Sequence, residues 1–227
     1  MSDDVLSIEV YSDVVCPWCY IGKRRIDRAV ARVKEVSHAA ITWRPFQLNP
    51  TMPKEGMDRT TYLEAKFGTL DAFRQLEKRM LAAATEEQIA FAFDKMSRTP
   101  NTFDAHRLIW FGARQGLQDA VVESLFRGYF EEGADIGSVS TLVQLAERAG
   151  LKGQAVERLL LSDEGESAVQ AEEAGGRKLG IRAVPYFVLN QTYGISGAQP
   201  VDVFQTAIDS VRRQALVAAQ GRRPGGD

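Results

Sequence analysis

The first 46 residues restrict the fold more than any other part of the chain, because strand and helix patterns alternate there around a pair of cysteines. Leu6, Ile8 and Val10 alternate with polar residues, which is the period of a half-buried β-strand. A helical pattern starts at Cys16–Pro17, and residues 41–46 read as a second strand that ends before Asn49–Pro50. Strand, helix and strand in this order indicate an α/β fold.

The middle of the chain is predicted to be helical, and strands return near its end. "AVPYFVLN" and "TYGISG" read as short strands, and residues 201–219 form an amphipathic helix. The simplest division is one domain made of residues 1–58 and 180–220, an all-helical insertion of residues 59–179, and a disordered tail of residues 221–227. Within the insertion we expect separate helices near residues 70–81, 101–116, 119–130, 138–149, 152–161 and 164–179.

Composition and charge exclude several classes of partner. The 227 residues carry a formal net charge of -2, which does not suit a general nucleic-acid binder. The start "MSDDVLSIEV" lacks the features of a secretory signal, and no apolar run approaches the ~18 residues that span a bilayer. We therefore expect a cytoplasmic protein without a membrane or nucleic-acid partner, in which a cysteine pair serves catalysis or metal binding rather than structure.

Cys16 and Cys19 are the only cysteines, and Pro17 and Trp18 separate them. If Pro17 is the first helical residue, Cys16 is the N-cap, and the helix dipole with its unpaired N–H groups favours the thiolate of Cys16. That thiolate can attack a disulfide in another molecule, and Cys19 can then attack Cys16 and release the reduced partner. The motif predicts Cys16 as the nucleophile and Cys19 as the resolving cysteine, with Pro17 stiffening the turn and Trp18 offering an apolar platform.

A zinc site and a purely structural role are the alternatives for this cysteine pair. Zinc needs two further ligands, but the chain has no other cysteine, and His38 and His106 are far apart and not at the spacing of a zinc finger. Two structural cysteines would not need to follow a strand and open a helix. No metal is therefore expected.

Five phrases, in order along most of the chain, resemble the FrnE-like subfamily of DsbA-type proteins in the thioredoxin superfamily. They are "VCPWCYIGKRR", "WRPFQLNP", "SRTPNTFDAHRLIWF", "AVPYFVLN" and "GISGAQP". The resemblance implies a thioredoxin-like fold with a helical insertion. It also implies thiol–disulfide oxidoreductase activity, with disulfide isomerisation as a further activity of the same pair.

The resemblance also implies roles for particular residues. Val184–Pro185 matches the place where the superfamily has a cis-proline beside the cysteines, which leaves backbone groups free to pair with a substrate. Related kappa-class glutathione transferases and 2-hydroxychromene-2-carboxylate isomerases characteristically have serine where this chain has Cys16. The cysteine therefore favours disulfide chemistry. Some FrnE-like proteins carry a second cysteine pair near the C-terminus, which this chain lacks.

Four further residues are candidates for substrate or glutathione binding. Asn101 and Thr102 are suited to cap a helix, and the alternative is that Asn101 lines the cleft over the reactive cysteine. His106 is either a packed histidine, the reading we favour, or a proton shuttle. Ser196 and Gly197 form either a plain turn or, as in glutathione-using relatives, a loop that holds the γ-glutamyl group.

We therefore expect a disulfide oxidoreductase without a tightly bound cofactor, with glutathione as a candidate redox partner. Its substrate is a protein or small molecule that carries a thiol or disulfide. The alternatives are a glutathione-dependent isomerase or transferase and a non-catalytic protein that binds a partner. The sequence leaves open the substrate, the direction of electron flow and the oligomeric state, a homodimer included.

Overall fold

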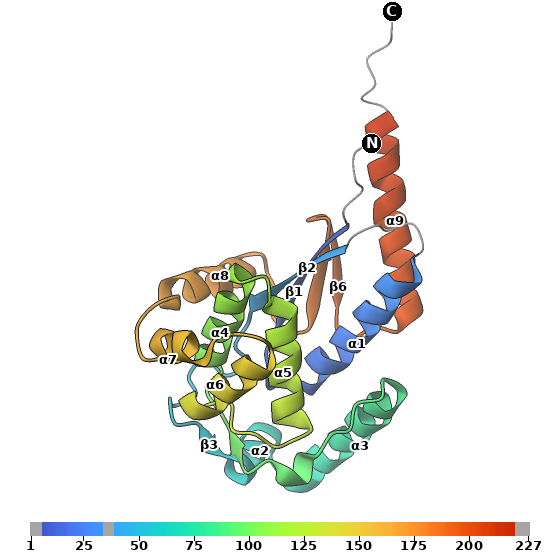
Figure 1. Cartoon of the computed structure of the whole chain (residues 1–227). Helices are drawn as coiled ribbons and strands as arrows, with labels where there is room; N and C mark the ends of the chain where they lie inside the picture. The colour runs from blue at the N-terminus through green and yellow to red at the C-terminus, as the bar shows by residue number, and fades with distance from the viewer. Residues whose placement is uncertain (1–5, 34–38, 221–227) are drawn as a thin grey trace, which may run out of the picture.

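The structure is a computed structural model that describes residues 6–33 and 39–220 (Figure 1). The predicted tail of residues 221–227 and His38 lie outside the described residues. In chain order the elements are β1 (Leu6–Ser12), α1 (Pro17–Arg32), β2 (Ala39–Pro45), β3 (Met57–Asp58), α2 (Arg59–Phe67), α3 (Leu70–Glu86), a short 3-10 helix (Phe93–Lys95), β4 (Arg98–Thr99), α4 (Phe103–Arg114), α5 (Gln118–Phe130), α6 (Val139–Arg148), α7 (Gly153–Leu160), α8 (Glu166–Lys178), β5 (Tyr186–Leu189), β6 (Tyr193–Ser196) and α9 (Val201–Gln220).

The two ends of the chain build one mixed sheet of order β2-β1-β5-β6. β1 pairs in parallel with β2, where Leu6 lies opposite Ala39, and antiparallel with β5, where Tyr11 lies opposite Tyr186. β5 and β6 are antiparallel neighbours. A parallel strand–helix–strand unit joined to an antiparallel hairpin is the arrangement of a thioredoxin-like fold, as the sequence predicts.

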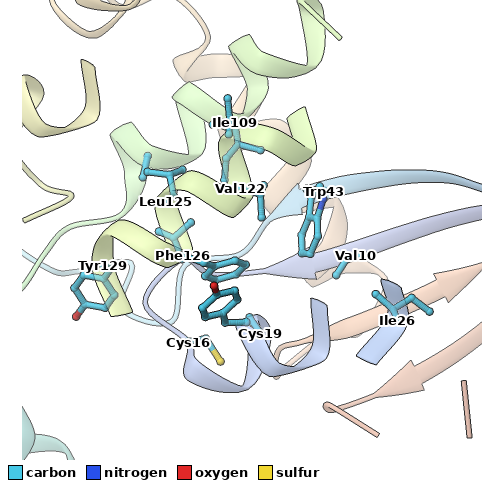
Figure 2. Packing of buried hydrophobic residues seen from close by; sticks show 14 of the residues in the cluster. Val10, Cys16, Cys19, Ile26, Trp43, Ile109, Val122, Leu125, Phe126 and Tyr129 are labelled. Carbon is cyan, nitrogen blue, oxygen red and sulfur yellow. The ribbon is translucent and has the colours of Figure 1, made fainter. Parts of the chain in front are cut away.

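The core lies where the sheet, α1 and the insertion meet. The apolar side of β1 is buried, as its alternation predicts. α1 packs against α9, and α5 and α8 pack against β2 (Figure 1). Figure 2 shows Val10 of β1, Ile26 of α1, Trp43 of β2 and Phe126 of α5 within this one cluster. The sheet and the insertion therefore share one hydrophobic core.

The insertion contains the predicted helices and two features that the helical pattern did not predict. Residues 59–67 form a helix of their own, α2, whose N-cap Asp58 accepts a hydrogen bond from the backbone N–H of Thr61 at 2.9 Å. β4 pairs antiparallel with β3, which lies just before residue 59, so the insertion contains a short strand and is not purely helical. Strands of two residues are too short to show an alternating pattern, which explains why the sequence does not reveal them.

Arg107 of α4 is only 2% exposed and holds the later part of the insertion together. Its guanidinium donates hydrogen bonds to the backbone carbonyls of Leu159, Ser162 and Glu164, and to the Asp104 carboxylate at 2.7 Å. These carbonyls belong to the end of α7 and to the turn before α8. The planar guanidinium can reach several acceptors at once, which a lysine ammonium cannot do from the same position.

We expect Arg107→Met to lower the free energy of unfolding by about 3 kcal/mol, because the buried carbonyls and the Asp104 carboxylate lose their donor. Arg107→Lys should recover only part of this loss. Urea denaturation followed by circular dichroism measures both. Arg158→Met, at an exposed position of α7, is the matched control and should change stability by less than ~0.5 kcal/mol. Equal effects of Arg107→Met and the control would contradict this role.

Candidate active site

Cys16 is the N-cap of α1 and Pro17 is its first residue, as the sequence predicts. The Cys16 backbone is extended, and its N–H donates to the carbonyl oxygen of Asp13 at 3.0 Å. Its own carbonyl accepts from the N–H of Cys19, also at 3.0 Å. As the N-cap residue, Cys16 lies at the N-terminus of α1, which is the positive end of the helix dipole. Its side chain makes no capping hydrogen bond to the first turn of the helix.

The two cysteines are free thiols in different surroundings. Cys16 is 5% exposed and borders a cleft, whereas Cys19 is fully buried. Burial raises the pKa of the Cys19 thiol well above its usual value, and the neighbouring Cys16 sulfur adds to this rise. Cys19 is therefore a neutral thiol at neutral pH, and Cys16 is the sulfur that an outside reagent meets first.

Pro185 lies beside the cysteines, and its peptide bond to Val184 is cis. The Cys16 thiol is 3.7 Å from the carbonyl oxygen of Val184, to which it donates. Gly22 of α1 permits this approach, because a Cβ there would lie 3.1 Å from Cγ of Pro185. The structure thus brings Cys16, Val184 and Pro185 together from opposite ends of the chain.

The Ser196–Gly197 turn contacts Pro185, whereas Asn101 does not line the cleft at Cys16. The N–H of Gly197 donates to the carbonyl oxygen of Pro185 at 2.8 Å, and Ser196 is exposed at the end of β6. The Asn101 side chain donates to the carbonyl oxygen of Met52 at 2.7 Å and accepts from the N–H of Phe103 at 2.9 Å. Asn101 therefore supports the start of α4 and lies outside the lining of the cleft at Cys16.

His106 of α4 is buried next to Asp13, a residue that the sequence did not identify as a candidate for the site. Its Nε2 is 3.4 Å from Oδ1 of the fully buried Asp13. In the described part of the chain neither of these two atoms has a hydrogen-bond partner, whereas the other Asp13 oxygen accepts from the N–H of Leu48 at 2.8 Å. His106 does not line the cleft. The only signal for Asp13 was that it interrupts the alternation of the first strand.

A cleft of about 470 Å³ opens beside Cys16, and the sequence did not predict its walls. Trp18, 37% exposed, borders it beside the cysteines, as its predicted role as an apolar platform requires. Side chains of α2 and α3 form the opposite wall, and Tyr129 and Phe130 of α5 contribute to the lining. Figure 2 shows Cys16, Cys19 and Tyr129 in one view of the buried cluster. The insertion therefore supplies most of the lining of this cleft.

A dithiol at the start of the helix that follows a central strand, beside a proline from the far end of the sheet, defines a thioredoxin-fold dithiol protein. A family model described as the DSBA-like thioredoxin domain matches residues 7–209. The chain belongs to this family, which confirms the resemblance to DsbA proteins.

Individual relatives agree with this assignment. The structure of a probable DsbA oxidoreductase, SCO1869 from Streptomyces coelicolor, is similar with a TM-score of 0.81 and 33% identity over 98% of this chain and 93% of that one. The uncharacterized protein YwbO of Bacillus subtilis (strain 168) is 27% identical over 91% of this chain and 98% of its own length. The cytosolic disulfide reductase DsbM of Pseudomonas aeruginosa shares the fold, with a TM-score of 0.64 and 17% identity over 92% of this chain and 99% of that one.

We expect iodoacetamide at pH 7 to modify Cys16 and to spare Cys19 in the folded protein. Cys19 is fully buried and its raised pKa keeps it protonated, whereas the thiolate is the nucleophile. Peptide mass spectrometry after a short exposure measures the two modifications separately. In guanidinium both cysteines should react. Comparable modification of both in the folded state would contradict the assignment of Cys16 as the reacting sulfur.

We expect Asp13→Ala to lower the free energy of unfolding by about 2 kcal/mol, because the half-buried Leu48 loses the acceptor of its N–H. Asp13→Asn retains an oxygen for that N–H and should cost clearly less. Urea titration of both variants measures the difference. If alanine and asparagine had the same effect, the hydrogen bond to Leu48 would not be the reason that Asp13 is buried here.

Proposed function

We propose that the protein is a thiol–disulfide oxidoreductase of the FrnE-like branch, with Cys16 as nucleophile and Cys19 as resolving cysteine. The observation that carries the proposal is the contrast between the two thiols, one at a helix N-terminus bordering a cleft and one buried a turn further along. Membership of the DsbA-like family supports a redox enzyme in general. We also propose that the same cysteine pair catalyses disulfide isomerisation.

The chemistry requires two steps. The Cys16 thiolate attacks one sulfur of a substrate disulfide, and the other substrate sulfur leaves as a thiolate with the bonding electron pair. Cys19 then loses its proton and attacks the Cys16 sulfur, which releases the second substrate thiolate. The protein gains an internal disulfide and the substrate gains two electrons; the reverse sequence oxidises a dithiol substrate.

The Val184 carbonyl and Pro185 are positioned to orient the substrate. The Val184 carbonyl oxygen faces the Cys16 thiol at 3.7 Å, so the sulfur of a bound substrate would lie next to this backbone segment. We assign Pro17 and Trp18 to shaping the rim of the site, and Ser196 and Gly197 to its far side.

Glutathione is the redox partner that we propose, with no tightly bound cofactor and a cytoplasmic site of action. A structure of the cytosolic disulfide reductase DsbM from Pseudomonas aeruginosa with GSH supports this choice through the shared fold. The turn at Gly197, bonded to Pro185, is the place where we expect its γ-glutamyl group. In the described part of the chain, every helix is too short or too polar to span a membrane.

A glutathione-dependent isomerase or transferase is the second candidate, and the enclosed cleft beside Cys16 favours it. A volume of about 470 Å³ lies within the usual range of small-molecule sites. In that case Cys16 would hold or stabilise a thiol without carrying electrons, and Cys19 would have no part in the reaction.

Equilibration of the protein with glutathione buffers separates the two candidates. An oxidoreductase should show a reversible two-electron transition of the Cys16–Cys19 pair between about −270 and −120 mV, the range that thioredoxin and DsbA span. Mass spectrometry after acid quenching identifies the species. A glutathione adduct on Cys16 without an internal disulfide at any ratio would favour the isomerase or transferase.

We expect Cys16→Ser to abolish reduction of glutathione disulfide, and Cys19→Ser to stop after the first step with glutathione bound to Cys16. The difference follows from the order of attack, because only Cys19 can release the mixed disulfide within the protein. Stopped-flow tryptophan fluorescence, with intact-mass analysis, measures both outcomes. Full turnover by Cys16→Ser would exclude Cys16 as the nucleophile.

A further inference from the structure

The cleft beside Cys16 has an apolar, largely aromatic lining. Phe67 of α2 and Phe73 and Met80 of α3 face it from one side, and Phe130 of α5 and Trp18 from the others. Leu76 and Trp18 are large apolar side chains left 40% and 37% exposed beside the opening. Apolar walls of this kind bind the body of a ligand by burying its surface.

The charged residues of the cleft are all cations. Arg59, Lys66 and Arg79 line it, and no carboxylate is among the described residues that do so. The Lys66 ammonium bonds to the Tyr62 hydroxyl at 2.6 Å and to the Asn49 side chain at 3.3 Å, both neutral groups. Arg59 lies over the rings of Phe73 and Phe93, each at 5.7 Å. Their positive charge in the cleft is therefore not balanced from within it.

We infer that the cleft selects a small disulfide or thiol with an aromatic or otherwise apolar body and a negatively charged group, such as a carboxylate. The apolar walls take the body, Lys66 and Arg79 attract the anion, and Cys16 at the edge reacts with the sulfur. This inference rests on the proposed function and adds the class of substrate. A volume of about 470 Å³ suits a small organic molecule and not a folded protein domain.

A suitable probe is 5,5′-dithiobis(2-nitrobenzoate), an aromatic disulfide with a carboxylate on each ring. The Cys16 thiolate forms a bond to one of its sulfurs, and the first thionitrobenzoate leaves with the electron pair of the broken S–S bond. Cys19 then gives up its proton, bonds to Cys16 and releases the second thionitrobenzoate. Each turnover oxidises the protein dithiol by two electrons and yields two coloured thiolates.

The test compares this anionic probe with 4,4′-dithiodipyridine, an uncharged aromatic disulfide, on reduced full-length protein in a stopped-flow instrument. We expect Lys66→Gln and Arg79→Gln each to slow the anionic probe about 3- to 10-fold and to slow the neutral probe much less, because a nearby charge mainly steers charged partners. Lys78→Gln is the matched control, since Lys78 is exposed on α3 but does not line the cleft. The differences should shrink as salt is added.

A second variant tests the apolar wall. Leu76 is partly exposed, so Leu76→Ser should leave the fold intact, yet it should slow both aromatic probes and not hydroxyethyl disulfide, which is small and uncharged. Circular dichroism and urea titration verify that the variants are folded.

Three outcomes overturn the inference. The first is equal rates for the anionic probe in Lys66→Gln, Arg79→Gln and Lys78→Gln, and the second is equal slowing of both aromatic probes by the charge variants. The third is a neutral peptide disulfide that outpaces the anionic probe regardless of Lys66 and Arg79, which would identify the cleft as a peptide groove. In each of these cases the disulfide chemistry of Cys16 stands. If no probe reacted at Cys16, the proposed function itself would fail.

Discussion

The packing of α1 against the insertion is the interaction on which the rest of the structure depends. Tyr20 stacks on Phe126 of α5 with ring centroids 5.0 Å apart, and its hydroxyl donates to Glu131 at 2.7 Å. Burial raises the pKa of this hydroxyl, which keeps it a neutral donor. Lys23, 3% exposed, pairs with Asp119 of α5 at 3.1 Å. Since the cysteines begin this helix, the contacts that join the insertion to the sheet also fix the reactive sulfur.

The same helix also positions the wall of the cleft. Glu87, buried just after the end of α3, accepts from Arg25 at 2.9 Å and from Arg28 at 2.7 Å. Arg25 also donates to the carbonyl oxygen of Ala198, just beyond the turn that bonds to Pro185. A single arginine of α1 thus connects the residue after α3 with the loop that follows β6. These contacts fix the positions of Cys16, the α3 wall of the cleft and the turn at Gly197 relative to one another. They explain how residues far apart in sequence form a single site.

The sequence predicts the features that repeat or that depend on neighbours in the chain. The alternation in β1, the helix that begins at Cys16 and Pro17, and the returning strands are local patterns, and the family resemblance added Val184 and Pro185. The positions of Asp13 and the burial of Arg107 depend on contacts with residues more than 30 positions away, for which the sequence has no local signal. The cleft was missed for the same reason. It arises where α2 and α3 face α1 across space, and a helical pattern does not reveal which side chains remain uncovered.

The burial of the two cysteines limits which substrates can react. Cys16 is 5% exposed, so under the proposed function a substrate disulfide has to enter the cleft or lie in an extended segment along Val184 before its sulfur comes within reach. In the proposed mechanism, Cys19 attacks the Cys16 sulfur once Cys16 is bonded to the substrate, and its raised pKa makes removal of its proton a necessary part of this second step. Cys16 lies at the N-terminus of α1 and borders the cleft, whereas Cys19 is buried one turn further along. In the proposed mechanism, this difference in burial sets the order in which the two sulfurs react, and the residues that line the cleft select the disulfide that reaches Cys16.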